Sequence, residues 1–325
     1  MAAATVRSSP LVRVVVNSVQ KLYPQALADK SWDNTGPTLQ LRQILTSSIM
    51  SSPPRSPPPP PTTTPPPSAH TILLTIDLTR AVVDEALSTN SSMIIAYHPI
   101  IFRPLKSLSL RDTQQESLLR LAQAGISVYS PHTAVDAALG GVNDWLADGI
   151  SGGRGNEESR RVLEESMAPP DGFEGSGMGR MVVLKKAQKL GDLVERVKAY
   201  LGMQHLMVAA TEAHNSGDAL ISRIALCAGS GGSMFKHLDV DLFFTGELSH
   251  HEALGARERG ISTISCFHTN TERGFLAAVM KPKLLEVLKE EWARLKATPE
   301  GREFAGDAEV QVAVSAADRD PYEIV

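Results

Sequence analysis

Short runs rich in β-branched residues alternate along this chain with longer amphipathic runs. In the first half, the apolar runs at 71–76, 93–97 and 126–130 predict strands, and the amphipathic runs at 79–87 and 113–125 predict helices. Such alternation is typical of α/β layers built on a parallel or mixed sheet. It also puts loops at the ends of strands, where α/β sheets bind their ligands.

The second half repeats this pattern. Strands are predicted at 181–184, 223–229, 241–245 and 262–266. A helix is predicted at 190–202, and further helices are expected between the last three strands. We therefore predict an α/β fold of two halves, each a mixed sheet flanked by helices.

Two segments of biased composition interrupt the alternation. Within residues 51–69, 10 of the 15 residues from 53 to 67 are proline, which predicts an extended insert in a surface loop. A ligand for SH3 or WW domains is the alternative interpretation. Residues 151–174 are rich in Gly, Pro, Ser and charge and predict a joint. The halves are then 1–150 and 175–325, and we expect the C-terminal part to return to the cleft between them.

Bulk composition excludes several classes of protein. The chain of 325 residues has a net charge of −4 and no long basic run, which argues against direct nucleic-acid binding. No apolar run approaches the ~20 residues needed to span a membrane. Two cysteines form no disulfide framework and suit a reducing compartment. We expect the cytoplasm, with mitochondria or the nucleus as alternatives.

The N-terminus has two interpretations. Three basic residues precede the first acidic residue, Asp29, as in a mitochondrial presequence. Apolar residues also recur there at helical spacing, at Leu11, Val15, Val19 and Leu22. The second pattern favours a helix of the protein core.

Histidines follow three of the predicted strands at the point where each strand ends. They are His98, His132 and His268, and two of these ends also supply an acid, Asp136 and Glu272. Each alone has an ordinary explanation: a hydrogen-bonded histidine, a helix cap, or a polar first turn. Together they are the inventory of a dinuclear metal site, in which histidines bind single ions and a carboxylate bridges. Histidine with carboxylate suits zinc, manganese or iron.

Other polar groups could serve the same cleft. The turn at Gly229, Ser230 and Gly231 follows a strand and could hold an anion with its backbone amides, although tight packing explains the glycines nearly as well. Glu247 and His251 are candidates for contacts with the metal ligands or the substrate.

Standard motifs of other sites are missing from the sequence. Cys227 and Cys266 lie inside apolar runs and favour packing over metal binding. The sequence contains no HExxH, GxSxG, CxxC, GxGxxG or GxxxxGK[ST] motif.

Eight ordered segments resemble the Nif-three-like family, whose bacterial members are catalogued as GTP cyclohydrolase I type 2 homologues. The segments are "SWDNTGPTLQ", "TIDLTRAVVDEAL", "MIIAYHPIIFRPLKSL", "YSPHTAVDAALGGVNDWLAD", "GFEGSGMGR", "ALCAGSGGS", "TGELSHHEAL" and "HTNTERGFL". They cover most of the chain, and the forms "YHP" and "HTNTERGFL" look like the eukaryotic, fungal branch.

This resemblance implies a site for about two divalent metal ions per chain, in the cleft between the halves of a ring-shaped hexamer. The implied ligands are His98, Asp136, His268 and Glu272. Many bacterial members have two histidines before the proline, whereas this chain has Tyr97 as the first. One metal position is therefore expected to be weaker, or to be completed by His132 or water.

Two functions of different classes fit the resemblance. The first is a metal-dependent hydrolase, cyclohydrolase-like or phosphoesterase-like, acting on an anionic or nucleotide-like small molecule. Glu272 and a metal-bound water would then carry the chemistry. The second is a non-catalytic metal-binding scaffold or a regulatory partner, because a eukaryotic relative is named for binding a transcriptional adaptor.

Overall fold

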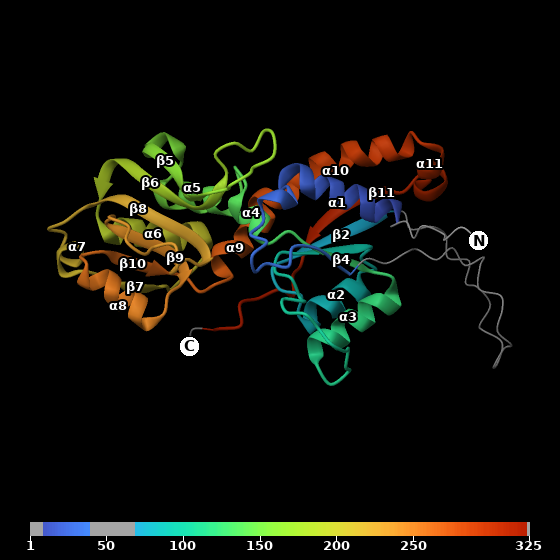
Figure 1. Ribbon diagram of the computed structural model, residues 1–325, viewed down its shortest axis with the longest axis horizontal. Coiled ribbons are helices and arrows are strands. Elements are labelled where there is room, and N and C mark those ends of the chain that lie inside the picture. Colours follow the sequence, from blue (N-terminus) through green and yellow to red (C-terminus); the bar gives the residue numbers. More distant parts are fainter. Residues whose placement is uncertain (1–8, 40–68, 324–325) are drawn as a thin grey trace.

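Two mixed sheets form the framework of the computed structural model, which describes residues 9–39 and 69–323 (Figure 1). The first sheet has the strand order β1-β4-β3-β2-β11, and the second has the order β5-β6-β8-β9-β10-β7. This architecture confirms the predicted α/β class, with a mixed sheet and flanking helices in each half. The proline-rich insert, up to residue 68, lies outside the described residues.

The first sheet is parallel except at one edge. Its strands are β1 (Gly36–Leu39), β2 (Ala69–Thr75), β3 (Met93–Ala96), β4 (Ser127–Ser130) and β11 (Glu309–Val314). Only β1 runs antiparallel to its neighbour β4 among the described strands of this sheet. The carboxyl ends of β2, β3 and β4 therefore point to the same edge.

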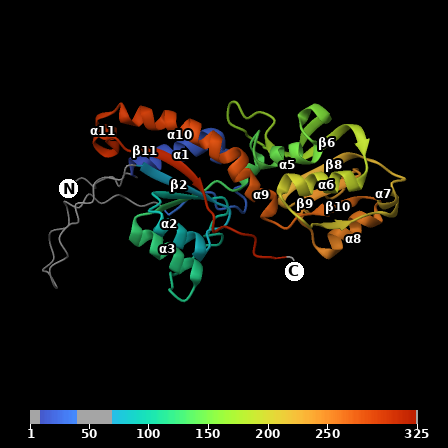
Figure 2. The same cartoon turned by 180° about the vertical axis from the view of Figure 1, so that it is seen from behind.

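Alternate residues of these strands face two different helical layers (Figures 1 and 2). Ile72 and Leu74 pack with α1 (Pro10–Leu22) and α10 (Lys281–Lys296). Leu73 lies on the opposite face, with α2 (Arg80–Ser88) and α3 (Thr113–Ala124). Burial on both faces explains why these strands read as continuous apolar runs. It also confirms that the N-terminal amphipathic run is a core helix.

The second sheet combines an antiparallel and a parallel part. Its strands are β5 (Glu157–Glu165), β6 (Gly177–Gln188), β7 (Met207–Ala209), β8 (Ile221–Ser230), β9 (Leu242–Glu247) and β10 (Ser262–Ser265). β8, β9 and β10 are parallel to one another. Helices α5 (Val142–Ser151) and α6 (Leu190–Leu201) cover one face, and α8 (His250–Glu258) covers the other.

Short helices complete the fold. They are α4 (Thr133–Ala137), α7 (Glu212–Ser216), α9 (Asn270–Phe275), α11 (Pro299–Ala305), the 3₁₀ turns η1 (Gln25–Leu27) and η2 (Arg154–Asn156), and the π-helical turn η3 (Leu276–Met280). One continuous apolar core includes residues of both sheets, so the halves share a packed interface. Within the described ranges, no helix is both long and apolar enough to cross a membrane.

Capping residues encode several helix ends. The Thr79 side chain accepts the backbone N–H of Val82, and Asp112 caps α3 in the same way. Gly125 ends α3 in the left-handed conformation, with φ 74°. A reciprocal capping box joins Ser249 and the glutamate three residues later at the start of α8.

A buried arginine fastens α5 to β6. Arg180 is 1% exposed, and its Nε and Nη2 donate to the Asp144 carboxylate at 2.8 and 2.9 Å. Its guanidinium also donates to the carbonyl oxygens of Ala138, Gly177 and Gly179. The charge is thus paired and its donors are used, which a buried arginine requires.

The expected joint at 151–174 differs from the structure, because residues 157–165 form β5. This is an edge strand whose exposed positions carry Glu, Ser and Arg, with Glu157 and Val162 buried. Such a strand lacks the apolar run by which the other strands were recognised. The prediction of a helix between 223–229 and 241–245 is also wrong, since residues 232–237 form consecutive turns.

The C-terminal residues also differ from the expected division into halves. After β10 the chain passes through α9, α10 and α11 and adds β11 beside β2, in parallel register. The first sheet is therefore completed by residues from the predicted second half.

Candidate metal centre

The carboxyl ends of parallel strands from both sheets meet at one place. In the first sheet, His98 follows β3, His132 follows β4, and Asp77 follows β2. In the second sheet, Glu247 ends β9, and His268 follows β10. The ring centroids of His98 and His268 are 5.3 Å apart, and those of His98 and His132 are 5.2 Å apart. Three histidines from separate strand ends thus form one cluster.

Backbone geometry directs two of these histidines. His132 has φ 34°, and Phe267, which precedes His268, has φ 62°. Positive φ is unfavourable for residues with bulky side chains and concentrates at functional sites. The turns out of β4 and β10 are therefore held by the surrounding fold in a conformation that the local sequence does not prefer.

Each histidine of the cluster donates its Nδ1–H to a carboxylate. The three pairs are His98 with Asp77 at 2.9 Å, His132 with Asp33 at 2.7 Å, and His268 with Glu247 at 2.9 Å. Metal-binding histidines are held in this way, since the partner fixes the tautomer and leaves Nε2 for the metal. Glu247 thus lies against His268, one of the predicted ligands.

Glu272 lies between two of these Nε2 atoms. Its Oε2 is 3.4 Å from His98 Nε2, and its Oε1 is 3.6 Å from His268 Nε2. Glu272 is 3% exposed, and its Oε2 is buried with no hydrogen-bond partner among the described residues. His98, His268 and Glu272 can each place a ligand atom within 4.8 Å of the others. These residues therefore suit a metal ion.

Asp136 enters from α4 on the side of the first sheet. It is 8% exposed, and the Tyr97 hydroxyl donates a hydrogen bond to its Oδ1. Tyr97 thus positions a predicted ligand. Burial, followed by the charges of Asp136 and Glu272, raises the pKa of Tyr97 well above its usual value. The phenol therefore stays protonated and is a poor metal ligand.

A cavity of about 180 Å³ lies beside this cluster, while His98 and Asp77 line a different hollow. Asp136, His132, His268 and Glu272 line the cavity together with Cys227 and Gly229. The space would hold metal ions and a small polar group, but not a whole nucleotide. Burial raises the pKa of the Cys227 thiol, so it contributes a neutral wall.

The electrostatics of the cavity favour a cation. Burial, with a contribution from Glu272, raises the pKa of Asp136 to about 6, although His132 and Tyr97 act in the opposite direction. Burial lowers the pKa of His98, but the charge of Glu272 and the hydrogen bond to Asp77 outweigh it and give about 10. The carboxylates thus favour a positive charge at His98, and a divalent ion would supply that charge in place of the proton on Nε2.

The predicted anion-binding turn is largely occupied by other contacts. The Gly229 N–H donates to Thr271 Oγ1 at 2.9 Å, and the Gly231 N–H donates to Thr245 Oγ1 at 3.0 Å. Ser230 lines the cavity between them. Two of the three amides expected to hold an anion are therefore already satisfied, and the turn is better explained as a wall of the cavity.

Gly229→Ala is expected to weaken metal binding. A Cβ there would lie 2.8 Å from His268 Nε2 and 3.0 Å from Glu272 Oε1, and the residue has φ +63°. The backbone conformation alone should cost about 1 kcal/mol of folding stability. Metal titration and urea unfolding measure the two effects. Gly191→Ala is the control, because nothing lies within 4 Å of its added Cβ. Equal metal affinity in both variants would contradict the expectation.

Two carboxylates of the cluster were not predicted from the sequence, and one residue that was expected in the same cleft lies elsewhere. Asp33 and Asp77 bond to His132 and His98, and both follow apolar or aromatic residues in the quoted segments "SWDNTG" and "TIDLT". Neither was singled out from the sequence, because an aspartate is also a common turn residue. His251 lies on α8 and lines a different hollow.

Asp77→Ala is expected to weaken metal binding by about 10- to 100-fold, as loss of a carboxylate behind a metal-binding histidine usually does. The reason is that His98 would lose the acceptor that fixes its tautomer. Isothermal titration with Zn²⁺ or Mn²⁺ measures the affinity. Asp84→Ala, at an exposed position of α2, is the matched control, since Asp84 contacts Arg120 at the surface. Unchanged affinity for Asp77→Ala would show that the pair does not serve a metal.

Comparison with known proteins identifies relatives of this chain. Residues 65–298 match the family described as Duf34/NIF3 (NGG1p interacting factor 3). The chain is 48% identical over 278 residues to the "Protein NIF3 homolog" of Schizosaccharomyces pombe, covering 85% of this chain and 88% of the relative. It is 44% identical over 273 residues to "NGG1-interacting factor 3" of Saccharomyces cerevisiae, covering 82% and 88%.

Solved structures share the fold at low sequence identity. A Bacillus cereus protein related to NIF3 superposes with a TM-score of 0.69 at 19% identity, covering 99% of this chain and 100% of that one. Reduced HcgD from Methanocaldococcus jannaschii has a TM-score of 0.60 at 18% identity, covering 94% and 98%. The family match and the two fungal relatives confirm the resemblance seen in the sequence. The chain belongs to the Duf34/NIF3 (NGG1p interacting factor 3) family.

Proposed function

We propose that this protein is a metal-dependent hydrolase that binds about two divalent ions where its sheets meet. The observation that carries the proposal is the buried Oε2 of Glu272, which has no hydrogen-bond partner among the described residues. It is flanked by histidines whose Nδ1 atoms are held by carboxylates. His98, His268 and Glu272 would hold one ion. Asp136, with His132, would complete the second position from the other wall of the cavity.

The chemistry follows from this donor set. Nitrogen and carboxylate oxygen donors suit zinc, manganese or iron, and a bound ion supplies Lewis acidity and activates water near neutral pH. The chain's own residues orient the ligands: Asp77, Asp33 and Glu247 fix the histidine tautomers, and Tyr97 holds Asp136. The cavity of about 180 Å³ admits the reacting group of a small anionic or nucleotide-like substrate, with the remainder outside.

An activity screen tests this function. Protein loaded with Zn²⁺, Mn²⁺ or Fe²⁺ is assayed against phosphoesters, nucleotides and cyclic amidines, with His268→Ala as the control. We expect turnover that depends on the metal and is lost in His268→Ala. Turnover that persists in His268→Ala would contradict the assignment of the site. Metal binding without turnover on any class would favour the alternative below.

The alternative is a metal-binding scaffold or regulatory partner. It is favoured by the name of the Saccharomyces cerevisiae relative, an NGG1-interacting factor. Two large exposed aromatic side chains also lie together: Trp32 lines the cavity, and its ring centroid is 5.9 Å from that of Phe102. A cytoplasmic location suits the hydrolase, whereas a partner in transcription must reach the nucleus. Exposed apolar patches mark protein contacts in many soluble proteins.

We also propose that the chain assembles into a closed homo-oligomer of about six copies, as the family resemblance implies and as point-group symmetry favours. Size-exclusion chromatography with light scattering measures the mass in solution. A monomer mass at micromolar concentration would reject this assembly.

A further inference from the structure

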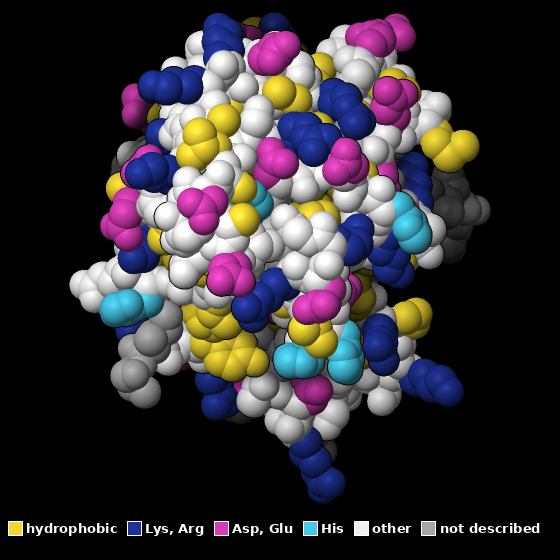
Figure 3. All heavy atoms as spheres, turned by 90° about the vertical axis from the view of Figure 1, so that its left-hand side faces the viewer, with side chains coloured by type: hydrophobic (Ala, Val, Ile, Leu, Met, Phe, Trp, Pro, Cys, Tyr) yellow, Lys and Arg dark blue, Asp and Glu magenta, His cyan; other side chains and the backbone are white. Residues whose placement is uncertain are grey.

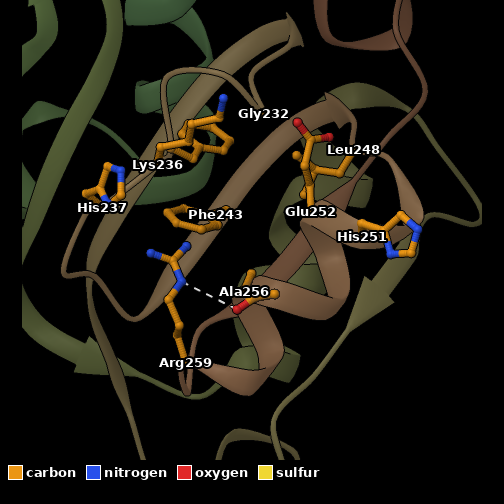
Figure 4. A pocket seen from close by; sticks show the side chains of 11 residues that line it. Gly232, Lys236, His237, Phe243, Leu248, His251, Glu252, Ala256 and Arg259 are labelled. Atoms are coloured by element: carbon orange, nitrogen blue, oxygen red, sulfur yellow. Dashed lines mark hydrogen bonds between the residues drawn. The ribbon is translucent and has the colours of Figure 1, made fainter.

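A second hollow, of about 350 Å³, lies against α8 and away from the metal centre (Figure 4). We name it the α8 hollow. It lies between that helix and the turns that follow β8. Its main lining residues are Lys236, His237, Phe243, Leu248, His251 and Arg259. Its volume is within the usual range of small-molecule sites, roughly 300–1,000 Å³.

The charge around the α8 hollow is mainly positive. Lys236 and Arg259 line it, and neither forms an ion pair with a carboxylate in the part of the chain that the structure describes. Glu252 is the only acidic side chain among the lining residues, and its carboxylate already accepts the Ser249 N–H at 2.8 Å. The hollow therefore carries two cations against a single carboxylate.

This excess is local rather than general. Figure 3 views the end of the molecule that carries α7 and α8, where Lys and Arg side chains are interspersed with Asp and Glu. A broad basic face would attract polyanions without a defined site. A few cations gathered at one hollow of limited volume suit a small anion instead.

The floor of the hollow is aromatic. Phe235 and Phe243 stack with ring centroids 4.6 Å apart and an angle of 8° between their planes. Arg259 reaches toward Phe243 in Figure 4, with its guanidinium carbon 5.7 Å from the centroid of that ring. A guanidinium held over an aromatic ring contacts that ring through its planar face. The N–H groups at its edge then stay available to bind a phosphate.

We propose that the α8 hollow binds a small aromatic phosphate, of the size of a mononucleotide. The phosphate would lie between Lys236 and Arg259, and its flat ring would pack against the apolar floor beside Leu248. Arginine matches phosphate through paired N–H donors, whereas lysine acts as a point charge. His237 and His251 at the margin add donors for the phosphate or the sugar.

Binding at this hollow must be separated from binding at the metal centre. Ser233 and Met234 line the metal cavity, whereas Phe235 and Lys236, next in the chain, line the α8 hollow. A phosphate that coordinates a metal could therefore imitate the expected result. The measurement uses full-length protein treated with chelator, and the same protein carrying Glu272→Gln.

The probes are AMP, GMP, CMP, UMP and phenyl phosphate, with adenosine and inorganic phosphate as partial ligands. Isothermal titration or ligand-observed NMR measures their affinity. We expect at least one aromatic phosphate to bind. Adenosine and inorganic phosphate should each bind at least about tenfold more weakly than that phosphate. Charge-assisted hydrogen bonds are worth about this factor.

Variants then locate the site. Lys236→Ala and Arg259→Ala should each weaken binding about tenfold or more, as expected for loss of a charge-assisted contact. Arg257→Ala, an exposed arginine of α8 outside the hollow, is the matched control and should stay within about twofold, because it is an exposed surface change. Circular dichroism checks that all variants are folded. The proposal is overturned if no probe binds at millimolar concentration, or if both variants bind as tightly as the Arg257 control.

Discussion

Glu272→Gln is expected to weaken divalent-metal binding by about a hundredfold or more, because loss of a ligand should exceed the effect of losing its outer partners. The substitution keeps the shape of the side chain and removes its charge. Oε2 of Glu272 is buried without a hydrogen-bond partner among the described residues, so the site loses the one carboxylate placed between His98 and His268. Elemental analysis and competition with a chelating dye measure the loss.

A matched control separates this effect from general loss of acidity. Glu286→Gln removes an exposed carboxylate on α10 and should leave metal content unchanged. Circular dichroism should show the same helix content in both variants. If Glu272→Gln retains the metal content and affinity of the unmodified chain, the cluster is not a metal site and the proposed hydrolysis has no centre.

Arg180→Ala is expected to destabilise the fold by about 3–5 kcal/mol, the usual cost of leaving one member of a buried ion pair alone. Asp144 would lose both hydrogen bonds from the guanidinium, and three carbonyl oxygens would lose their donor. Total stabilities are commonly about 5–15 kcal/mol, so soluble yield should fall sharply. Urea unfolding followed by tryptophan fluorescence, to which Trp145 on α5 contributes, measures the change.

The pH dependence of this contribution follows from Asp144. Burial raises its pKa, but the hydrogen bond and charge of Arg180 outweigh this and lower it. A lowered carboxyl pKa gives stability that is present above the unfolded value of about 3.9 and is lost as pH falls through the folded value. The stabilities of Arg180→Ala and of the unmodified chain should thus converge in strong acid.

The control for Arg180→Ala is Arg161→Ala, at an exposed position of β5, which should change stability by less than about 0.5 kcal/mol. A similar small change in Arg180→Ala would contradict the argument.

The sequence predicted those elements whose residues are buried on both faces. β3 and β8 read as apolar runs because helices cover both sides of their sheets, and helix ends such as Gly125 carried their own signals. β5 was missed because an edge strand exposes charged positions. β11 was missed because its pairing with β2 joins residues more than two hundred positions apart, which no local pattern contains.

The candidate site divides in the same way. His98, His132 and His268 were predicted as site residues, because each closely follows an apolar run that is recognisable in the sequence. Their partners Asp33 and Asp77 were not found, because an aspartate in a turn is common and only the folded chain shows which ring it meets. His251 lies on a helix, as predicted. Tertiary packing, however, decides which way that helix faces, and it places His251 in the α8 hollow.

The pairing of β11 with β2 bears on the order in which the chain can fold during its synthesis. The ribosome delivers all strands of the second sheet by residue 265, whereas the first sheet waits for residues 309–314. At about 5–20 residues per second, the edge of β2 that will pair with β11 stays unpaired for about 10–40 s after β3 has emerged. An exposed edge of a largely apolar sheet invites pairing with another nascent chain. Chaperone protection should therefore matter most for the N-terminal sheet, even though it is translated first.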